Sequence, residues 1–327
     1  IGISPLIIGL TVVAFGTSSP ELVVSLIAAM NGNPDLAVGN VVGSNIFNVL
    51  FILGLSALVA PLVVSRQLVR IDVPVLIACS AVLLYIASGG LISCTAGVIL
   101  FAGLLLYTLF LIVEGRREKS PTSDEFDKEY GATRNRQPIT RLLKHTGFVA
   151  AGLFMLVVGS GWVVRGATEI ALYLGVSELV VGLTIVSAGT SLPEAATSVV
   201  ASLRGERDIA VGNIVGSNIF NILAVLGLSA VAAPGGIQVN PTAISFDIPV
   251  MTAVAVACLP IFFTGHLISR WEGALFFAYY TAYVIYLVLT ATGNHYLPVF
   301  GEAMLFFVIP ITTVTLIVLS FRYKRGK

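Results

Sequence analysis

The hexapeptide GTSSPE at Gly16–Glu21 occurs a second time, as GTSLPE at Gly189–Glu194, and this repetition decides the fold. Aligning residues 2–61 with residues 175–234 at a constant offset of 173 gives 35 identities in 60 positions without a gap. Weaker similarity continues beyond the aligned stretch. Self-similarity at a fixed offset indicates a duplicated structural unit, so we expect two related halves.

The composition indicates that lipid is the solvent for much of the chain. Of the 327 residues, 57% are hydrophobic and 11% are charged, and the mean hydropathy is +0.97. Soluble domains carry about 25% charged residues. The net charge of +1 gives no reason to expect a nucleic-acid partner.

Apolar runs bounded by charged or turn-forming residues predict ten membrane-spanning helices, since a span needs about 20 mostly apolar residues. The expected fold class is therefore an all-α polytopic membrane protein. The predicted spans are 1–29, 37–60, 72–88, 91–113, 143–173, 176–202, 209–233, 244–264, 270–291 and 298–321.

The repeat divides the chain into four parts. We expect a first half at 1–113, a polar linker at 114–142, a second half at 143–291, and an extra span with a basic tail at 292–327. The second half begins with a span, 143–173, that has no counterpart in the first half. We therefore expect the first half to lack its first span.

Basic residues predict the orientation. If the linker is cytoplasmic and the spans alternate, seventeen of the eighteen lysines and arginines lie on the cytoplasmic side, as the positive-inside rule requires. We expect an integral protein of the plasma (inner) membrane with a cytoplasmic linker and C-terminus. The spans that carry Glu21 and Glu194 are five spans apart, so they cross in opposite directions. The halves are then inverted-topology repeats, the arrangement that supports alternating access to a midplane site.

Glu21 and Glu194 each lie within a span, with apolar sequence on both sides. An ionised group at that depth costs about 2.5–3.5 kcal/mol on insertion scales, so a buried carboxylate binds a cation or takes a proton. A single such glutamate could instead hold a helix kink through backbone hydrogen bonds. Two matched glutamates in inverted repeats favour a shared ion site.

A proline precedes each glutamate, at Pro20 and Pro193. Proline removes a helical hydrogen bond and clashes with the preceding turn, so we expect broken helices at the ion site. Irregular backbone at membrane depth is tolerated where it is buried in protein or lines a cavity. Oxygen ligands would come from freed carbonyls and from four hydroxyls, those of Thr17, Ser18, Thr190 and Ser191.

The second repeated motif is GN-x-VGSNIFN, which ends at Asn48 in one copy and at Asn221 in the other. Ser44 and Asn48 are four residues apart and share a helix face, which we expect to face Glu21. The matched pair is Ser217 and Asn221. The glycines of the motif permit close helix packing.

Two asparagines of the same motif, Asn40 and Asn45, have two open interpretations. Hydrogen bonding between helices explains them at least as well as ion contact does. Asp72 and Asp247 also match in the repeat and begin spans, and we interpret them as charges at helix N-termini.

The donor types predict which ions bind. Carboxylates, amides, hydroxyls and carbonyls form an all-oxygen set, which suits hard cations such as Ca²⁺ and Na⁺. The motifs contain no His or Cys, which argues against Zn²⁺ or Cu⁺. Two negative charges balance one divalent ion or two monovalent ions, so each cargo can neutralise the same site. No organic cofactor is expected.

The paired motifs GTSSPEL with GNVVGSNIFN, and GTSLPEA with GNIVGSNIFN, resemble the two alpha-repeats of the cation/calcium antiporter superfamily. The similarity covers almost the whole chain and is greatest to prokaryotic sodium/calcium exchanger homologues. It implies ten spans in two inverted five-span repeats. On that plan Ile1 begins in the second span and 298–321 is an addition.

The resemblance also implies a ligand set in which Glu21 and Glu194 are central and Ala14 and Ser187 contribute backbone carbonyls. Some members have Asp where this chain has Asn221. That departure leaves two carboxylates here and argues against potassium-dependent exchange. The remaining implied ligands are Thr17, Ser18, Ser44, Asn48, Thr190, Ser191, Ser217 and Asn221.

The sequence therefore predicts a secondary transporter that exchanges Ca²⁺ for Na⁺, and not an enzyme. An intramembrane enzyme would need a nucleophile and a base, and no His or Lys lies within the middle of a span. A Ca²⁺/H⁺ antiporter is the alternative, because the two glutamates could carry protons. A cation channel, whose filter broken helices can also build, is a further class.

Overall fold

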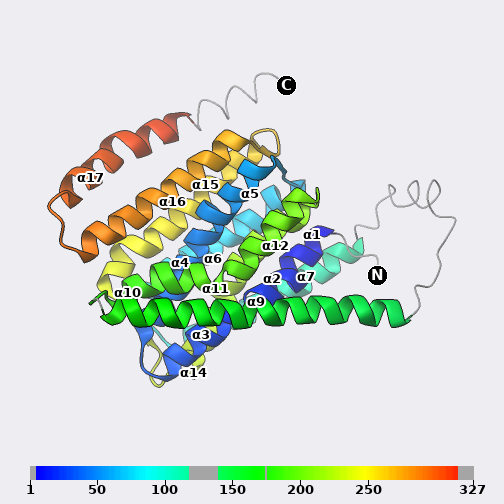
Figure 1. Ribbon diagram of the computed structural model, residues 1–327, viewed down its shortest axis with the longest axis horizontal. Helices are drawn as coiled ribbons and strands as arrows, with labels where there is room; N and C mark the ends of the chain where they lie inside the picture. Colours follow the sequence, from blue (N-terminus) through cyan, green and yellow to red (C-terminus); the bar gives the residue numbers. More distant parts are fainter. Residues whose placement is uncertain (1–4, 118–138, 174, 316–327) are drawn as a thin grey trace.

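The computed structural model is a helical bundle, shown in Figure 1. It describes residues 5–117, 139–173 and 175–315. Most of the predicted linker at 114–142, the start of the chain at Ile1 and the basic tail lie outside these residues. The described residues confirm the predicted all-α fold class, with only two short sheets.

The helices of the first half follow each other closely, and η marks π-helical segments. They are α1 (Pro5–Ile8), η1 (Gly9–Val13), α2 (Ala14–Thr17), α3 (Ser19–Met30), α4 (Pro34–Ile46), η2 (Phe47–Leu53), α5 (Gly54–Val59), η3 (Leu68–Asp72), α6 (Val73–Ala87) and α7 (Cys94–Arg117).

The second half repeats this order after one long helix. Its elements are α9 (Ile139–Tyr173), α10 (Glu178–Val181), η4 (Gly182–Val186), α11 (Ser187–Thr190), α12 (Leu192–Leu203), α13 (Arg207–Phe220), η5 (Asn221–Leu226), α14 (Gly227–Ala232), η6 (Ala243–Asp247), α15 (Ile248–Phe263) and α16 (Arg270–Ala291). The extra span that follows contains α17 (Leu297–Ala303) and η7 (Met304–Val308).

Over their described residues, the ten predicted spans each coincide with a helix or a series of helices. Among the described residues, seven helices are long and apolar enough to cross a membrane, and two bent pairs raise the number to nine. The long helix α9 covers the remaining predicted span, 143–173. At the predicted linker the helices extend further than expected, because α7 continues to Arg117 and α9 begins at Ile139.

The two bent pairs lie where the sequence predicted broken helices. The helix ending at Thr17 and the helix beginning at Ser19 meet at 45°, and the helices on either side of Ser191 meet at the same angle. Ser18 and Ser191 leave the helical conformation in the same way, with ψ near 8° at both. Because Pro20 and Pro193 have no N–H to donate to the preceding turn, a continuous helix is disfavoured at both positions.

Two central helical series form the middle of the bundle. In the helical series 34–59, 83% of the residues in its most apolar stretch are buried, and in the series 207–232 the corresponding share is 89%. Each crosses the broken span of the other half at a glycine. A Cβ at Gly43 would lie 2.6 Å from the Leu183 carbonyl oxygen, and one at Gly216 would lie 2.7 Å from that of Leu10. Only glycine permits backbones to approach this closely.

Two short antiparallel sheets show how the halves are related. β1 (Leu62–Val63) pairs with β4 (Leu267–Ile268), and β2 (Leu91–Ile92) pairs with β3 (Ile237–Gln238). In the repeat β1 corresponds to β3, and β2 corresponds to β4. The symmetry operation that superposes one half on the other therefore moves the β1–β4 sheet onto the β2–β3 sheet. The 20-residue series 68–87 separates β1 from β2, so the sheets lie at opposite ends of the bundle. Superposing one half on the other therefore reverses the direction in which the spans cross, as inverted repeats require.

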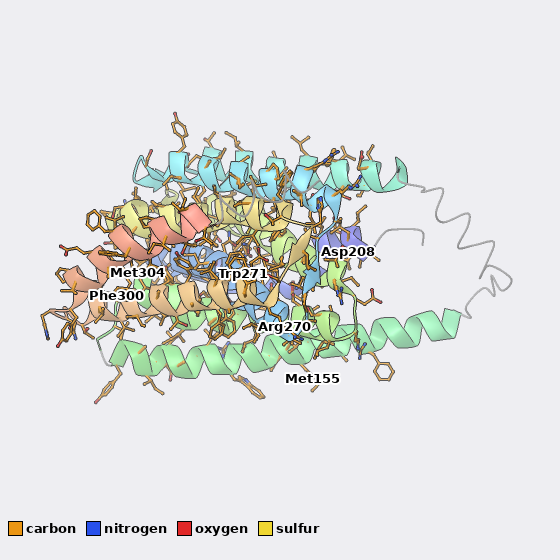
Figure 2. All side chains as sticks on the ribbon, turned by 90° about the horizontal axis from the view of Figure 1, so that it is seen from above. Met155, Asp208, Arg270, Trp271, Phe300 and Met304 are labelled. Carbon is orange, nitrogen blue, oxygen red and sulfur yellow. The ribbon has the colours of Figure 1, made fainter. Side chains whose placement is uncertain are left out.

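The outer helices cover this centre. α6 packs against α15, α7 packs along η5 and α14, and α16 packs along η2 and α5. α9 runs along one side of the bundle, and α17 lies outside α16 (Figure 1). In Figure 2, Met155 on α9 points away from the bundle, and Phe300 and Met304 lie on the peripheral helix α17 and its continuation η7. These surfaces are the ones that hydrocarbon would cover.

Candidate ion-binding site

The two glutamates are tied together by serines of the opposite half. Glu21 and Glu194 lie in the first turns of α3 and α12, where helix N-termini favour negative charge, and both side chains are fully buried. Ser191 Oγ donates to Glu21 Oε1 at 2.8 Å, and Ser18 Oγ donates to Glu194 Oε1 at 2.7 Å. Each half thus completes the other's carboxylate site.

The two threonines of the acidic motifs contact asparagines of the opposite half. Thr17 Oγ1 lies 3.2 Å from Asn213 Oδ1, and Asn213 Nδ2 donates to Ser198 Oγ at 3.0 Å. The matched contacts join Thr190 Oγ1 to Asn40 Oδ1 at 3.0 Å and Asn40 Nδ2 to Ser25 Oγ at 2.9 Å. Asn40 therefore connects helices, as one of its two interpretations expected. The supporting serines Ser25 and Ser198 were missed, although they occupy matched positions in the repeat.

Four asparagines meet where the two central helices cross. Asn45 Nδ2 donates to the Asn218 carbonyl at 3.3 Å, and Asn218 Nδ2 donates to the Asn45 carbonyl at 3.1 Å. Asn48 Nδ2 donates to Asn218 Oδ1 at 2.9 Å, and Asn221 Nδ2 donates to Asn45 Oδ1 at 3.1 Å. The side-chain amides of Asn48 and Asn221 are thus positioned by hydrogen bonds that their nitrogens donate.

Four buried oxygens of this site have no hydrogen-bond partner among the described residues. They are Glu21 Oε2, Glu194 Oε2, Asn48 Oδ1 and Asn221 Oδ1. Leaving a buried acceptor unsatisfied costs about 1–3 kcal/mol, and more for a charged group. Two carboxylate and two amide oxygens in matched positions are a donor set for a hard cation.

The remaining sequence candidates make hydrogen bonds within or beside the acidic motifs. The Ala14 carbonyl accepts from Ser18 N at 3.0 Å, and the Ser187 carbonyl accepts from Ser191 N at 3.1 Å. Ser217 Oγ lies 3.4 Å from Glu194 Oε1, as its place in the motif suggests. Ser44 differs from the expectation that it faces Glu21, because its hydroxyl donates to the Ser187 carbonyl at 3.4 Å. Because Gly43 has no side chain, α4 can approach the backbone around Leu183 and Ser187 closely enough for this bond.

Asp72 and Asp247 do directly precede α6 and α15, as the interpretation of charges at helix N-termini expected, but they do not cap these helices through their side chains. Neither makes a capping hydrogen bond, since π-helical turns continue directly into α6 and α15 at both positions. Instead, Tyr107 Oη donates to Asp72 Oδ1 and Tyr283 Oη donates to Asp247 Oδ1, each at 2.9 Å. These buried acid–phenol pairs fasten α7 to α6 and α16 to α15. The sequence gave no local signal for them, because the partners are 35 and 36 residues apart.

Comparison with known proteins agrees with this geometry. The sodium/calcium exchanger protein family matches the chain over residues 1–113 and 144–289. The chain belongs to that family. Sodium/calcium exchanger family proteins are membrane transporters, not enzymes, and the predicted superfamily is therefore confirmed.

Several individual proteins resemble the chain over most of its length. Inner membrane protein YrbG of Escherichia coli (strain K12) is 42% identical over 258 residues, which cover 78% of this chain and 77% of that protein. Sodium/calcium exchanger MaX1 of Methanosarcina acetivorans is 31% identical over 319 residues, covering 88% and 90%. A solved structure of the sodium-calcium exchanger NCX_Mj is 29% identical with a TM-score of 0.69, covering 86% of each chain.

Proposed function

We propose that this chain exchanges Ca²⁺ for Na⁺ across the membrane by alternating access. The observation that carries the proposal is the set of four matched, buried and unpartnered oxygens on Glu21, Glu194, Asn48 and Asn221. No Lys or Arg among the described residues is within hydrogen-bonding distance of either carboxylate. A cation is therefore the partner that removes the cost of burying them.

The arrangement supports exchange rather than one-way binding. Two carboxylates balance one Ca²⁺ or two Na⁺, so either cargo restores neutrality in the same place. The serine–glutamate bonds connect the two broken spans reciprocally, so a movement that exposes the site to one end of the bundle has a matched counterpart toward the other end. The hydroxyls and carbonyls of Thr17, Ser18, Thr190 and Ser191, with those of Ser44, Ser217, Ala14 and Ser187, complete the proposed ligand set.

The orientation that we propose follows the basic residues. Arg66, Arg70 and Arg270 flank β1 and β4, and the helix lengths put the turn at Arg204–Arg207 at the same end of the bundle. We assign this end to the cytoplasm. The linker at 114–142 and the C-terminus are then cytoplasmic as well, and the membrane is the plasma (inner) membrane.

The test is calcium uptake into proteoliposomes with Na⁺, K⁺ and pH gradients imposed separately. We expect radioactive calcium to accumulate when Na⁺ is trapped inside, and not when only a K⁺ or pH gradient is present. Uptake driven by a pH gradient in Na⁺-free buffer would replace the proposal with Ca²⁺/H⁺ antiport, for which the same two glutamates would carry protons. Calcium conductance that needs no counter-ion would indicate a channel.

A further inference from the structure

Two matched serines outside the ion site have buried hydroxyls with no hydrogen-bond partner among the described residues. They are Ser56 on α5 and Ser229 on α14, which occupy equivalent positions in the repeat, and both side chains are fully buried. A buried helical hydroxyl usually donates to the carbonyl one turn earlier, as Ser80 does to Leu76 at 2.9 Å. A buried polar group that stays unsatisfied in both halves calls for a functional explanation.

Each serine lies on the same helix face as the proposed amide ligand that precedes it. Ser229 follows Asn221 by eight residues, and Ser56 follows Asn48 by the same number. Two α-helical turns contain about seven residues, and a π-helical turn, with its i→i+5 hydrogen bond, adds about one more. The π-helical segments η5 and η2 run through these two stretches. Each hydroxyl is therefore two turns, or roughly 11 Å, further along the helix face that carries the amide.

Both hydroxyls point away from the outer helices and toward the helices that carry the glutamates. Gly227 faces α7, because a Cβ there would lie 3.1 Å from the Gly97 carbonyl oxygen. Ser229 follows Gly227 by two residues, which is about 200° around the helix. Apart from its own continuation η5, the other element that packs extensively against α14 is α3. In the same way Gly54 faces α16, and Ser56 lies on the side of α5 that packs against α12.

The contact between α3 and α14 leads from the ion site to one end of the bundle. Glu21 and Asn221 lie at the starts of α3 and η5, and both helical series run from there to the same end. At that end a pocket of about 470 Å³ is lined by Ala29, near the end of α3, and by Ala233, directly after α14. Ser229 precedes Ala233 by about one turn. Its hydroxyl therefore lies between the ion site and this pocket.

The matched contact between α12 and α5 leads from Glu194 to the opposite end, at the turn that contains Arg204. α9 packs against another side of α12. Ser56 has no partner in the described part of the chain even with α9 in place. The unsatisfied hydroxyl is thus a property of the helix contact itself and not of an uncovered helix face.

We propose that Ser229 and Ser56 bind the cation in transit, Ser229 between the site and the end that we assign to the outside, and Ser56 between the site and the cytoplasm. A neutral oxygen ligand suits a hard cation and replaces a contact that the ion loses when it leaves water. Because the hydroxyl carries no charge, it holds the ion weakly enough to release it to the carboxylates, as passage through successive sites requires. This role rests on the proposed exchange function and adds two residues to it.

The first test is calcium self-exchange in proteoliposomes, in which radioactive calcium outside replaces unlabelled calcium inside and no Na⁺ or pH gradient is needed. Ser229→Ala and Ser56→Ala should each slow this exchange about two- to tenfold, the effect of losing one neutral polar contact. Calcium affinity measured by isothermal titration should stay the same, because neither hydroxyl belongs to the resting site. Ser80→Ala is the control, since that buried hydroxyl is already bonded within α6.

The second test locates the two routes. In a chain whose native cysteines Cys79, Cys94 and Cys258 are replaced by alanine, Ser229→Cys and Ser56→Cys each introduce one thiol. A membrane-impermeant, positively charged thiosulfonate should modify the first from outside, in right-side-out vesicles, and the second from the cytoplasmic face, in inside-out vesicles. Calcium should slow both reactions. Because this is a gain of signal, it decides the matter even if the alanine variants fold poorly.

The outcomes separate this role from the exchange function on which it rests. Self-exchange at the unsubstituted rate in both alanine variants overturns the transit role, and so does an equal loss in Ser80→Ala. A thiol reagent that reaches neither position, or both from the same face, overturns it as well. Lower thermal stability with unchanged exchange would assign the serines to packing alone. If the unsubstituted chain neither binds nor exchanges calcium, the proposed exchange function itself is wrong.

Discussion

The hydrogen bonds from Ser18 to Glu194, at 2.7 Å, and from Ser191 to Glu21, at 2.8 Å, are nearly the same in the two halves. The contacts of the central helices with the outer helices are not. Where η2 meets α16 four aromatic rings pack together, and where η5 meets α7 there is a cavity of about 520 Å³. The two halves therefore match in the serine–glutamate bonds between them, although Ser217 contacts Glu194 while Ser44 contacts the Ser187 carbonyl, and they differ more strongly one layer further out.

This difference suggests which parts of the molecule the proposed ion exchange would constrain. If the inward- and outward-facing states are related by exchanging the halves, contacts that break and reform at the site need similar energies in both. Packing against the outer helices is not exchanged in this way, so it can diverge while it keeps the central helices in place. Variants made in matched pairs can test both statements.

The largest effect is expected at the carboxylates. Glu21→Gln and Glu194→Gln should each abolish sodium-driven calcium uptake, because removing one partner of a buried charge interaction costs about 3–5 kcal/mol, or about two to four orders of magnitude in binding. Calcium binding by isothermal titration and uptake in proteoliposomes measure it. Glu178→Gln, at an exposed helix start, is the control. If one of the two variants transports normally, the carboxylates do not act as a pair.

The serine bonds between the halves should give the next effect. Ser18→Ala and Ser191→Ala each remove a hydrogen bond to a carboxylate, a contribution of about 1.5–3 kcal/mol, so the apparent calcium affinity should fall about ten- to hundredfold. The equality of the two halves predicts similar losses from both. Ser19→Ala is a close control, because that exposed hydroxyl donates to the Phe15 carbonyl instead. A loss confined to one serine would show that the site is asymmetric.

Stability should respond to the glycines of the crossing helices. A Cβ at Gly43 or Gly216 meets backbone oxygen at 2.6 or 2.7 Å, so Gly43→Ala and Gly216→Ala should each destabilise the protein by about 1–3 kcal/mol through overpacking. Thermal unfolding in detergent measures this. Gly152→Ala has nothing within 4 Å of the new atom among the described residues. That variant should be neutral or slightly stabilising, since glycine is unfavourable within a helix.

Much of this architecture could be predicted from the sequence because the relevant signals are local or repeated. Apolar runs predicted the spans, Pro20 and Pro193 predicted the breaks, and the spacing of the repeats predicted the inversion that the paired sheets show. The residues of the acidic motifs do come together. Each of these features depends on a few neighbouring residues or on counting spans.

What the sequence did not predict depends on contacts between distant segments. The bond from Ser44 to the Ser187 carbonyl joins residues 143 positions apart, and the tyrosine partner of Asp72 lies on another helix. The cavity required knowing that Ala224 faces α7, which no periodicity reveals. The π-helical turns at Phe47–Leu53 and Asn221–Leu226 also have no sequence signature, although such turns are frequent at functional sites.

The smallest expected effect is a difference in stability between variants of the two acid–phenol pairs. The two pairs have equal hydrogen-bond lengths but different surroundings. Tyr107→Phe and Tyr283→Phe each remove one hydrogen bond of 2.9 Å to a buried aspartate, which leaves the acceptor unsatisfied at a cost of about 1–3 kcal/mol. Tyr107 lines the cavity, so its neighbours have room to adjust. Tyr283 packs against Phe246 at 6.2 Å, one turn from the ring cluster of η2 and α16.

Because the cost of a buried deletion depends on how well its site can relax, Tyr283→Phe should destabilise the protein more than Tyr107→Phe. Chemical denaturation of both variants in the same detergent measures the difference, and Tyr85→Phe, at an 82% exposed side chain, sets the baseline. Filling the cavity with Ala224→Phe should then raise the cost of Tyr107→Phe toward that of Tyr283→Phe. If the two costs are equal before the cavity is filled, the outer layer is as symmetric in energy as the ion site, and the difference between the regions is one of shape alone.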